Sequence, residues 1–292
     1  MAVTDESFRS DARTPDTGGN GSLLAGATTG DLDWGLCSET GPRREHNEDF
    51  AGASVPDDPT APGPLFAVAD GLGGHAAGEI ASRTAVEVLL DRWRAGGADD
   101  AARHLRACAR DANSAVLTAS YERGRSGMGT TLTALAVAGR QALIAHVGDS
   151  RAYLVRGDAC EQLTSDHSRV AEMVRLKLIS AERAADHPAR SQLTRSLGAA
   201  MSLQVDLVRR PVQTDDVFVL CSDGLWDEVA RSEVLERVRA SRTDPARGVA
   251  AALVATAVER GCADNVTAVV VRILNDQPLQ AEPRRSLLPW RR

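Results

Sequence analysis

Acidic residues at the ends of short apolar segments are the residues of this sequence best suited to chemistry. Three apolar runs end in an Asp-Gly or Gly-Asp pair, and two further pairs that contain acids lie shortly after Arg44 and just before an expected strand. The five pairs are Glu48-Asp49, Asp70-Gly71, Gly148-Asp149, Asp223-Gly224 and Asp264-Asn265. Strand ends are rigid, and a glycine beside a carboxylate lets backbone or a ligand approach closely. One such aspartate is ordinarily a turn former, but the recurrence in one chain indicates a shared site.

Carboxylates gathered in one site repel one another, and a folded protein retains them when cations neutralise them. Ligands that are all oxygen favour hard ions, so the pattern predicts Mg²⁺ or Mn²⁺ and not zinc or copper. Two such ions about 3.5–4 Å apart can bridge a water, lower its pKa and hold a phosphate for in-line attack. Arg44 precedes the first acidic pair and offers a bidentate guanidinium suited to phosphate oxygens.

The elements that must position these acids follow from the apolar pattern. Short apolar runs closed by turn residues predict strands over residues 33–38, 64–69, 130–138, 142–147, 151–156, 203–209, 217–222 and 265–273. Apolar residues at helical spacing predict helices over residues 78–94, 99–120, 232–239 and 245–260. Because the strands come in neighbouring groups and not in strict βαβα alternation, we expect antiparallel sheets with helices outside, an α+β layered sandwich.

The chain is long enough to bury a core in one large domain, with 292 residues of which 43% are hydrophobic. We expect this domain over residues 31–275, since no internal linker interrupts them. Residues 1–30 are expected to form a disordered tail and residues 276–292 a flexible Arg/Pro-rich tail. The alternative for the second tail is a docking peptide, because Trp290 is flanked by arginine.

Charge and cysteine usage exclude several classes of protein. The net charge of −6 argues against nucleic-acid binding. Five cysteines without a CxxC pair make a disulfide framework or a zinc site unexpected and favour a reducing compartment. No stretch approaches the roughly 20 apolar residues of a membrane span, and the N-terminus has no apolar signal core. We therefore expect a cytoplasmic protein.

Eight segments of the sequence resemble, in order, those of the metal-dependent protein phosphatase family (the 2C type, PPM) in its bacterial form. The resemblance covers about residues 31–273. The segments are Arg44-Glu-His-Asn-Glu-Asp49, Asp70-Gly-Leu-Gly-Gly-His-Ala-Ala-Gly-Glu79, Met128-Gly-Thr-Thr131, His146-Val-Gly-Asp-Ser-Arg-Ala-Tyr153, Leu163-Thr-Ser-Asp-His-Ser168, Leu193-Thr-Arg-Ser-Leu-Gly198, Leu220-Cys-Ser-Asp-Gly-Leu-Trp-Asp227 and Asp264-Asn-Val-Thr267.

The resemblance implies a four-layer αββα sandwich whose two central, mainly antiparallel sheets hold metals in a cleft at one edge. It implies a serine/threonine phosphatase in which two Mn²⁺ or Mg²⁺ ions activate a water for direct attack on the phosphate. The implied metal residues are Asp70, Asp223 and Asp264, the carbonyl of Gly71, and Asp49 directly or through water. Glu48 and Asn265 are implied as supporting residues behind the ligands, and Arg44 as the group that binds the substrate phosphate.

Further roles implied by the resemblance are more open. Asp149, with Asp223 and Asp227, would form a third and weaker metal site, although Asp227 could instead cap the following helix. His75 lies near the position of the family's general acid, although it could be a mere loop residue. Residues 168–192 correspond to the family's flap beside the active site, and the flap is expected to begin with an amphipathic helix.

The expected substrates are phosphorylated proteins, with a cognate serine/threonine kinase as the opposing enzyme and a monomer as the default state. One alternative is a catalytically silent relative that only binds phosphoproteins. Another is a phosphodiesterase, although such sites usually include histidine ligands. A cysteine-based phosphatase is not expected, since we expect no Cys-x5-Arg nucleophile loop of the tyrosine-phosphatase kind in the chain.

Overall fold

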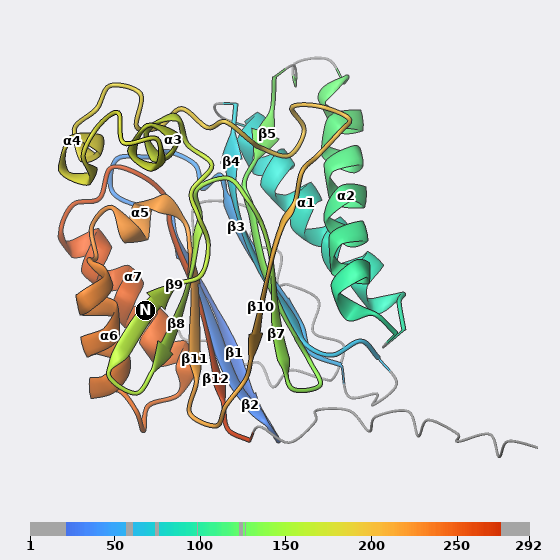
Figure 1. The fold of residues 1–292 in the computed structure, drawn as a ribbon, viewed down its shortest axis with the longest axis vertical. Helices are drawn as coiled ribbons and strands as arrows, with labels where there is room; N and C mark the ends of the chain where they lie inside the picture. The colour runs from blue at the N-terminus through green and yellow to red at the C-terminus, as the bar shows by residue number, and fades with distance from the viewer. Residues whose placement is uncertain are drawn as a thin grey trace, which may run out of the picture.

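Two antiparallel sheets packed face to face form the centre of the molecule, and helices cover both outer faces (Figure 1). The structure is a computed structural model that describes residues 22–56, 61–73, 76–97, 99–122, 125 and 127–275. This architecture confirms the expected α+β sandwich of four layers. No helix in the described part of the chain has the length and apolar character needed to cross a membrane.

The first sheet has the strand order β1-β2-β12-β11-β8-β9, and every neighbouring pair is antiparallel. Its strands are β1 (Leu23–Thr29), β2 (Leu32–Glu39), β12 (Val266–Ile273), β11 (Val217–Cys221), β8 (Arg151–Arg156) and β9 (Ala159–Gln162). Strand β12 is buried at all eight positions because its neighbours and the second sheet enclose it. Its sequence is apolar except at Thr267 and Arg272, which is close to the near-continuous apolar run expected of a strand buried on both faces.

The second sheet has the strand order β10-β7-β6-β4-β3, and the short strand β5 pairs with the end of β4. Its strands are β10 (Asp206–Pro211), β7 (Gln141–Val147), β6 (Leu132–Ala138), β4 (Leu65–Leu72), β3 (Asp49–Ser54) and β5 (Gly129–Thr130). Phe66 and Phe218 are fully buried between the two sheets. These side chains fix the distance between the sheets and hence the place where strand ends from both sheets meet.

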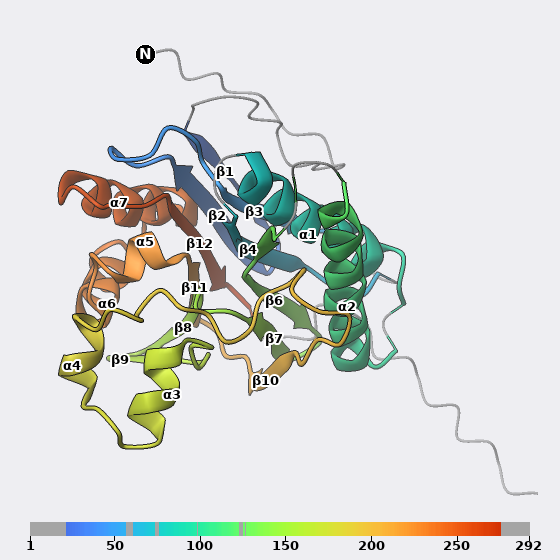
Figure 2. The ribbon, with the colours of Figure 1, turned by 90° about the horizontal axis from the view of Figure 1, so that it is seen from above.

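Two helix pairs form the outer layers, as Figure 2 shows from above. Helices α1 (Ala76–Arg94) and α2 (Ala101–Ser120) cover the second sheet, and α6 (Arg231–Ala240) and α7 (Ala246–Glu259) cover the first. In α1 the side chains of Ala81, Ala85 and Leu89 are completely buried, which is the i, i+4, i+8 stripe of a helix facing a core.

Three short helices lie at the edge where the strand ends meet. Helix α5 (Asp223–Trp226) follows β11 directly, and α3 (Arg169–Arg175) and α4 (Ala181–Ala185) form the flap. Ser168 caps α3 and Ser180 caps α4, each by accepting a bond from the backbone N–H three residues later. The flap therefore begins with a helix, as expected from the sequence, and a serine caps each of its two helices.

The expected N-terminal tail over residues 1–30 extends too far. Residues Leu23–Thr29 form β1, which pairs along its whole length with β2. The strand was not predicted because it is an edge strand of mostly small residues, in which Leu23 is buried while Leu24 is exposed. Residues 1–21 and the expected tail over residues 276–292 lie outside the described residues.

Candidate active site

Strand ends from both sheets bring five aspartates to one edge of the sandwich. Asp49 and Asp70 face each other in register at the ends of β3 and β4. Asp223 begins α5 immediately after β11, and Asp264 lies just before β12. The two loops pack against each other at Gly224, where an added Cβ would lie 2.1 Å from the backbone oxygen of Asn265. Only glycine allows the Asp223 loop to lie this close to the Asp264 loop.

Asp49 is held by two hydroxyl groups from the opposite sheet. Its Oδ2 accepts hydrogen bonds from Ser222 Oγ at 2.6 Å and from Thr267 Oγ1 at 2.7 Å. The side chain is buried, and both donors leave no freedom for it to rotate. Ser222 and Thr267 stand in motifs of the sequence, but their role as orienting donors was not predicted.

Asp70 is held through its backbone. Its N–H donates to Thr131 Oγ1 at 2.9 Å, and its carbonyl accepts from the Thr131 N–H at 2.9 Å. Thr131 is itself fixed by a 2.8 Å hydrogen bond to Ser150 Oγ. The Met128–Thr131 segment, one of the eight that carry the family resemblance, thus positions a carboxylate of the site.

Asp223 has a buried carboxylate oxygen, Oδ1, without a hydrogen-bond partner among the described residues. Its carboxyl group also shares a hydrogen bond with that of Asp70, and two carboxyl groups that share a site favour a shared proton. A buried acceptor without a donor costs about 1–3 kcal/mol. Such an atom in a site made of oxygen donors is suited to bind a cation.

The electrostatics of the cluster show that these groups interact. Burial, with the charges of Asp223 and Asp264, raises the pKa of Asp49 to about 7, although two hydroxyls oppose this effect. Burial and then the charge of Asp223 raise the pKa of Asp70 well above its ordinary value. Burial and then Asp264 raise the pKa of Asp223 to about 6. The fold thus concentrates negative charge that a divalent cation would neutralise.

The donors present fit hard divalent cations, since they are carboxylates and backbone carbonyls without a thiol or imidazole. Within the described ranges, no three His, Cys, Asp or Glu side chains already form a closed metal cage. The side chains instead contact one another, as in the Asp70–Asp223 pair. The site therefore has the ligand types of a magnesium or manganese centre, arranged at one sheet edge.

Arg44 lies at the rim of this cluster. Its Nη2 donates to Asp264 Oδ2 at 2.6 Å, and both side chains are partly exposed, at 45% and 34%. An exposed pair of this kind contributes at most about 1 kcal/mol to stability. The guanidinium is therefore held beside the carboxylates while remaining accessible to a phosphate.

Asp149 follows β7 and is 8% exposed. Its backbone carbonyl accepts a 3.0 Å hydrogen bond from the Trp226 indole N–H. Burial and then the charge of Asp223 raise the pKa of Asp149 to about 7. Asp227 lies one turn beyond Asp223 and forms an ion pair with Arg190 of the flap at 3.1 Å. Both acids thus lie on the flap side of the cluster.

Glu48 and Asn265 connect the two sheets behind the aspartates. The Glu48 N–H donates to Asn265 Oδ1 at 2.8 Å, and its carbonyl accepts from Ser82 Oγ at 2.6 Å and from the Gly71 N–H at 3.1 Å. Gly71 lies against α1, since a Cβ there would lie 2.2 Å from the Gly78 carbonyl oxygen. These contacts place the expected supporting residues around Asp70.

His75 and His167 differ in what the structure describes of them. His75, the expected general acid, lies outside the described residues. His167 is a structural hydrogen-bonding residue: its Nδ1 accepts from the Gly148 N–H at 3.1 Å, and its Nε2 faces Asp206 at 3.2 Å. Asp166 likewise forms a bidentate ion pair with Arg151, with a shortest distance of 2.7 Å.

A Cys-x5-Arg spacing does occur in the chain, from Cys37 to Arg43, contrary to the expectation that no such loop exists. The structure places Cys37 inside β2 and not in a loop. Burial and then the charge of Glu39 raise the pKa of the Cys37 thiol to about 12. This cysteine is a protonated core residue and not a nucleophile.

Comparisons with known proteins agree with this site. A family model described as protein phosphatase 2C matches residues 44–266. The chain is 39% identical over 239 residues to the serine/threonine phosphatase stp of Listeria innocua, which covers 80% of this chain and 93% of the relative. It is 37% identical over 251 residues to the serine/threonine protein phosphatase PstP of Mycobacterium tuberculosis, covering 84% of this chain and 46% of the relative.

Solved structures agree with the fold. The crystal structure of the Mycobacterium tuberculosis serine/threonine phosphatase PstP/Ppp superposes with a TM-score of 0.74 at 36% identity, covering 83% of this chain and 99% of that chain. The catalytic domain of PstP in complex with two manganese ions superposes with a TM-score of 0.73 at 33% identity, covering 84% and 99%. This chain belongs to the protein phosphatase 2C family of metal-dependent serine/threonine phosphatases.

Proposed function

We propose that this chain hydrolyses phosphoserine and phosphothreonine in proteins at the aspartate cluster, with two Mn²⁺ or Mg²⁺ ions. Asp70, Asp223 and Asp264 would hold the ions, with the Gly71 carbonyl and Asp49 completing the set. The observation that carries the proposal is the buried Oδ1 of Asp223, which has no hydrogen-bond donor within the described structure and lies among mutually repelling carboxylates. The relative crystallised with two manganese ions supports the same ion count.

The ions, when bound, supply Lewis acidity that lowers the pKa of a water and offsets charge on the phosphate. The protein's own residues supply position. Ser222 and Thr267 fix the Asp49 carboxylate, and Thr131 fixes the backbone of Asp70. Arg44 leaves its ion pair with Asp264 and binds the substrate phosphate. Its guanidinium forms two parallel hydrogen bonds with the phosphate oxygens and so orients the phosphate.

Two further roles complete the proposal. Asp149, Asp223 and Asp227 would bind a third, weaker ion, which is supported by the effect of the Asp223 charge on the pKa values of its neighbours. His75 would protonate the leaving seryl or threonyl oxygen, a role that rests on the family resemblance. His75→Gln should then lower turnover of an alkyl phosphopeptide far more than that of an aryl phosphate, whose leaving group needs no proton.

The proposed reaction is tested with purified protein and three substrates: a phosphothreonine peptide, an aryl phosphomonoester and an aryl phosphodiester. Each is incubated with Mn²⁺, with Mg²⁺ and with EDTA. We expect both monoesters to be hydrolysed with either metal and neither with EDTA, and the diester to be resistant. Turnover of no substrate would indicate a phosphoprotein-binding scaffold, and preference for the diester would indicate a phosphodiesterase.

We also propose that the enzyme is a cytoplasmic monomer that opposes a serine/threonine kinase. All five cysteines are free thiols in the structure, which suits a reducing compartment. Light scattering on the purified chain tests the monomer, and cell fractionation tests the location. In a strain from which the protein is deleted, phosphoproteomics should show that certain phosphothreonine sites accumulate. These sites should coincide with the sites that one kinase phosphorylates.

A further inference from the structure

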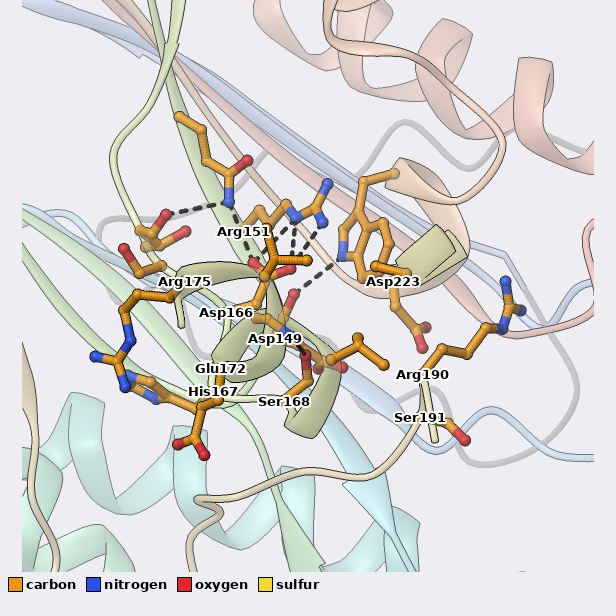
Figure 3. A pocket seen from close by; sticks show the side chains of 18 of the residues that line it. Asp149, Arg151, Asp166, His167, Ser168, Glu172, Arg175, Arg190, Ser191 and Asp223 are labelled. Atoms are coloured by element: carbon orange, nitrogen blue, oxygen red, sulfur yellow. Dashed lines mark hydrogen bonds and ion pairs between the residues drawn. The ribbon is translucent and has the colours of Figure 1, made fainter. Parts of the chain in front are cut away.

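A cavity of about 810 Å³ lies between the flap and the edge of the first sheet. Figure 3 shows Asp149, Arg151 and Asp166 gathered within it, with Arg190 to one side and Arg175 to the other. Asp149 and Asp223 line this cavity and also belong to the aspartate cluster. The cavity is thus continuous with the site at which a phosphorylated residue would be hydrolysed.

Apolar side chains form one part of the flap side of the cavity, here called its roof, and the opposite floor is polar. Val170 and Val174 of α3 and Ala181 of α4 line it from the flap side. On the floor, the Arg151 guanidinium carbon lies 3.6 Å from the centre of the Trp226 ring, which leaves a flat stacked surface. A long side chain with an aliphatic stem and a charged end matches a cavity of this kind.

The cavity has an excess of acidic groups. Seven acids and four arginines line it: Asp149, Asp166, Glu172, Asp186, Asp206, Asp223 and Asp227 against Arg151, Arg175, Arg190 and Arg195. Burial lowers the pKa of His167, the histidine of the lining, so it adds no positive charge near neutral pH.

Ion pairs already neutralise most of the arginines. Three pairs lie within the lining: Arg151–Asp166 at 2.7 Å, Arg195–Asp206 at 2.8 Å and Arg190–Asp227 at 3.1 Å. Glu172 and Asp186 of the flap have no ion-pair partner in the part of the chain that the structure describes. On the flap side, Glu172 and Asp186 outnumber Arg175 of α3, which is unpaired within the described ranges, and Asp149 and Asp223 at the strand ends add further acids, so the lining that remains is net negative.

We propose that this cavity binds an arginine or lysine side chain of the substrate, close in sequence to the phosphorylated residue. The proposal rests on the proposed function and names the class of phosphoprotein that the site prefers. The apolar roof would cover the aliphatic stem, and Glu172 and Asp186 would face the charged end. An extended peptide advances about 3.3–3.6 Å per residue, so a residue within a few positions of the phosphate reaches the cavity.

The test is a set of phosphothreonine peptides with a single arginine, alanine or glutamate at each of the four positions on either side of the phosphate. Steady-state kinetics with Mn²⁺ should show one or two positions at which arginine raises kcat/KM at least tenfold over glutamate, chiefly through KM. The double variant Glu172→Gln/Asp186→Asn should reduce this ratio at least threefold and leave the alanine peptide unchanged. Glu182→Gln is the matched control, because Glu182 belongs to the same flap but does not line the cavity.

The outcomes separate this proposal from the proposed function. Equal kcat/KM for all peptides, or a preference for glutamate, would overturn the cavity's role while leaving the phosphatase in place. An arginine preference that the double variant retains would also overturn it. Failure of every peptide to turn over, with the metals present, would instead contradict the proposed function.

Discussion

Asp223 is the residue at the centre of the carboxylate cluster. It shares a hydrogen bond with Asp70, and its charge raises the pKa values of Asp49, Asp70 and Asp149. Removing its charge should therefore affect every ion in the site at once.

Asp223→Asn should lower kcat at least about 100-fold, since even the loss of an outer residue behind a metal ligand costs about 10–100-fold. The amide replaces the carboxylate in the same volume, so the melting temperature without metal should not fall. Phosphate release and thermal melting measure the two effects. Asp215→Asn is the matched control, because Asp215 has a positive φ of 68° that asparagine tolerates and lies just before β11, at the end opposite the site. Near-normal turnover in Asp223→Asn would contradict the assignment.

The hydroxyl groups that hold Asp49 are the basis of a second prediction. Thr267→Val keeps the shape of the side chain but removes the 2.7 Å hydrogen bond to Asp49 Oδ2. We expect Mn²⁺ affinity, measured by calorimetry, to fall about 10-fold because the carboxylate loses part of its orientation. Thr256→Val removes a similar hydroxyl from the surface of α7, where it bonds the Ala252 carbonyl, and should leave Mn²⁺ affinity unchanged. Equal affinities in the two variants would show that Thr267 does not position Asp49.

Asp70, Asp149, Asp223 and Asp264 could be predicted from the sequence because each adjoins a strand end that the apolar pattern marks, whereas the role of Asp49 came from the family resemblance. Their orienting partners could not. Ser222 and Thr267 act across the two sheets at 173 and 218 positions from Asp49, and Thr131 lies 61 positions from Asp70, so none of these contacts leaves a local signal. The Arg44–Asp264 ion pair is equally non-local, with a separation of 220 positions.

At the scale of elements, close approach of α7 to β2 fixes the first sheet against its helical layer. A Cβ on Gly35 of β2 would lie 2.1 Å from the Arg247 Cα. The backbone of α7 cannot move at this one residue to make room for it. Gly248, the next residue of α7, has nothing within 4 Å of its own Cβ position. The contact therefore leaves no room for a side chain at Gly35, whereas Gly248 faces open space.

Gly35→Ala should destabilise the protein by about 3 kcal/mol, at the upper end of the range for overpacked cores. Gly248→Ala should be neutral or stabilising by up to about 1 kcal/mol, because alanine is the better helix former. Urea denaturation of the two variants measures the difference. If both substitutions destabilised the protein to a similar degree, the close approach of α7 would not be the reason why position 35 requires glycine.

Most elements could be predicted from the sequence, since strands such as β8 and helices such as α1 have strong local patterns. The strands that were missed have physical reasons. Strand β1 is an exposed edge, β9 is only four residues long with alternating exposure, and β3 consists largely of small residues that show no apolar run. Pairing with neighbours, and not local propensity, makes these segments strands.

At the scale of the whole molecule, the concentration of carboxylates links stability to pH and metal. The pKa values of Asp49 and Asp149 are raised to about 7, and that of Asp223 to about 6, from 3.8 in the unfolded chain. Because the folded pKa is the higher one, the neutral groups contribute stability that is complete below pH 3.8 and is lost as the pH rises through 6–7. Without metal, the protein should thus melt at lower temperature at pH 8 than at pH 6.

Mn²⁺ should reverse this trend. An ion at 100 times its Kd stabilises the folded state by about 2.7 kcal/mol, and it binds best once the carboxylates are ionised. Melting temperatures from pH 5 to pH 8, with Mn²⁺ and with EDTA, measure both effects. His146 affects stability in the opposite sense, since burial lowers its pKa to about 3. Its contribution is the same in wild type and in Asp223→Asn, so it cancels when the pH profile of the variant is subtracted from that of wild type. Identical pH profiles with and without metal would contradict the linkage.

The position of manganese in crystals tests the central claim most directly. Diffraction data collected on crystals grown with MnCl₂, at wavelengths on either side of the manganese absorption edge, locate the ions without reference to activity. We predict two strong anomalous peaks enclosed by Asp70, Asp223 and Asp264 with Asp49 alongside. Absence of peaks there at saturating manganese, or peaks only at other places on the molecule, would contradict the account.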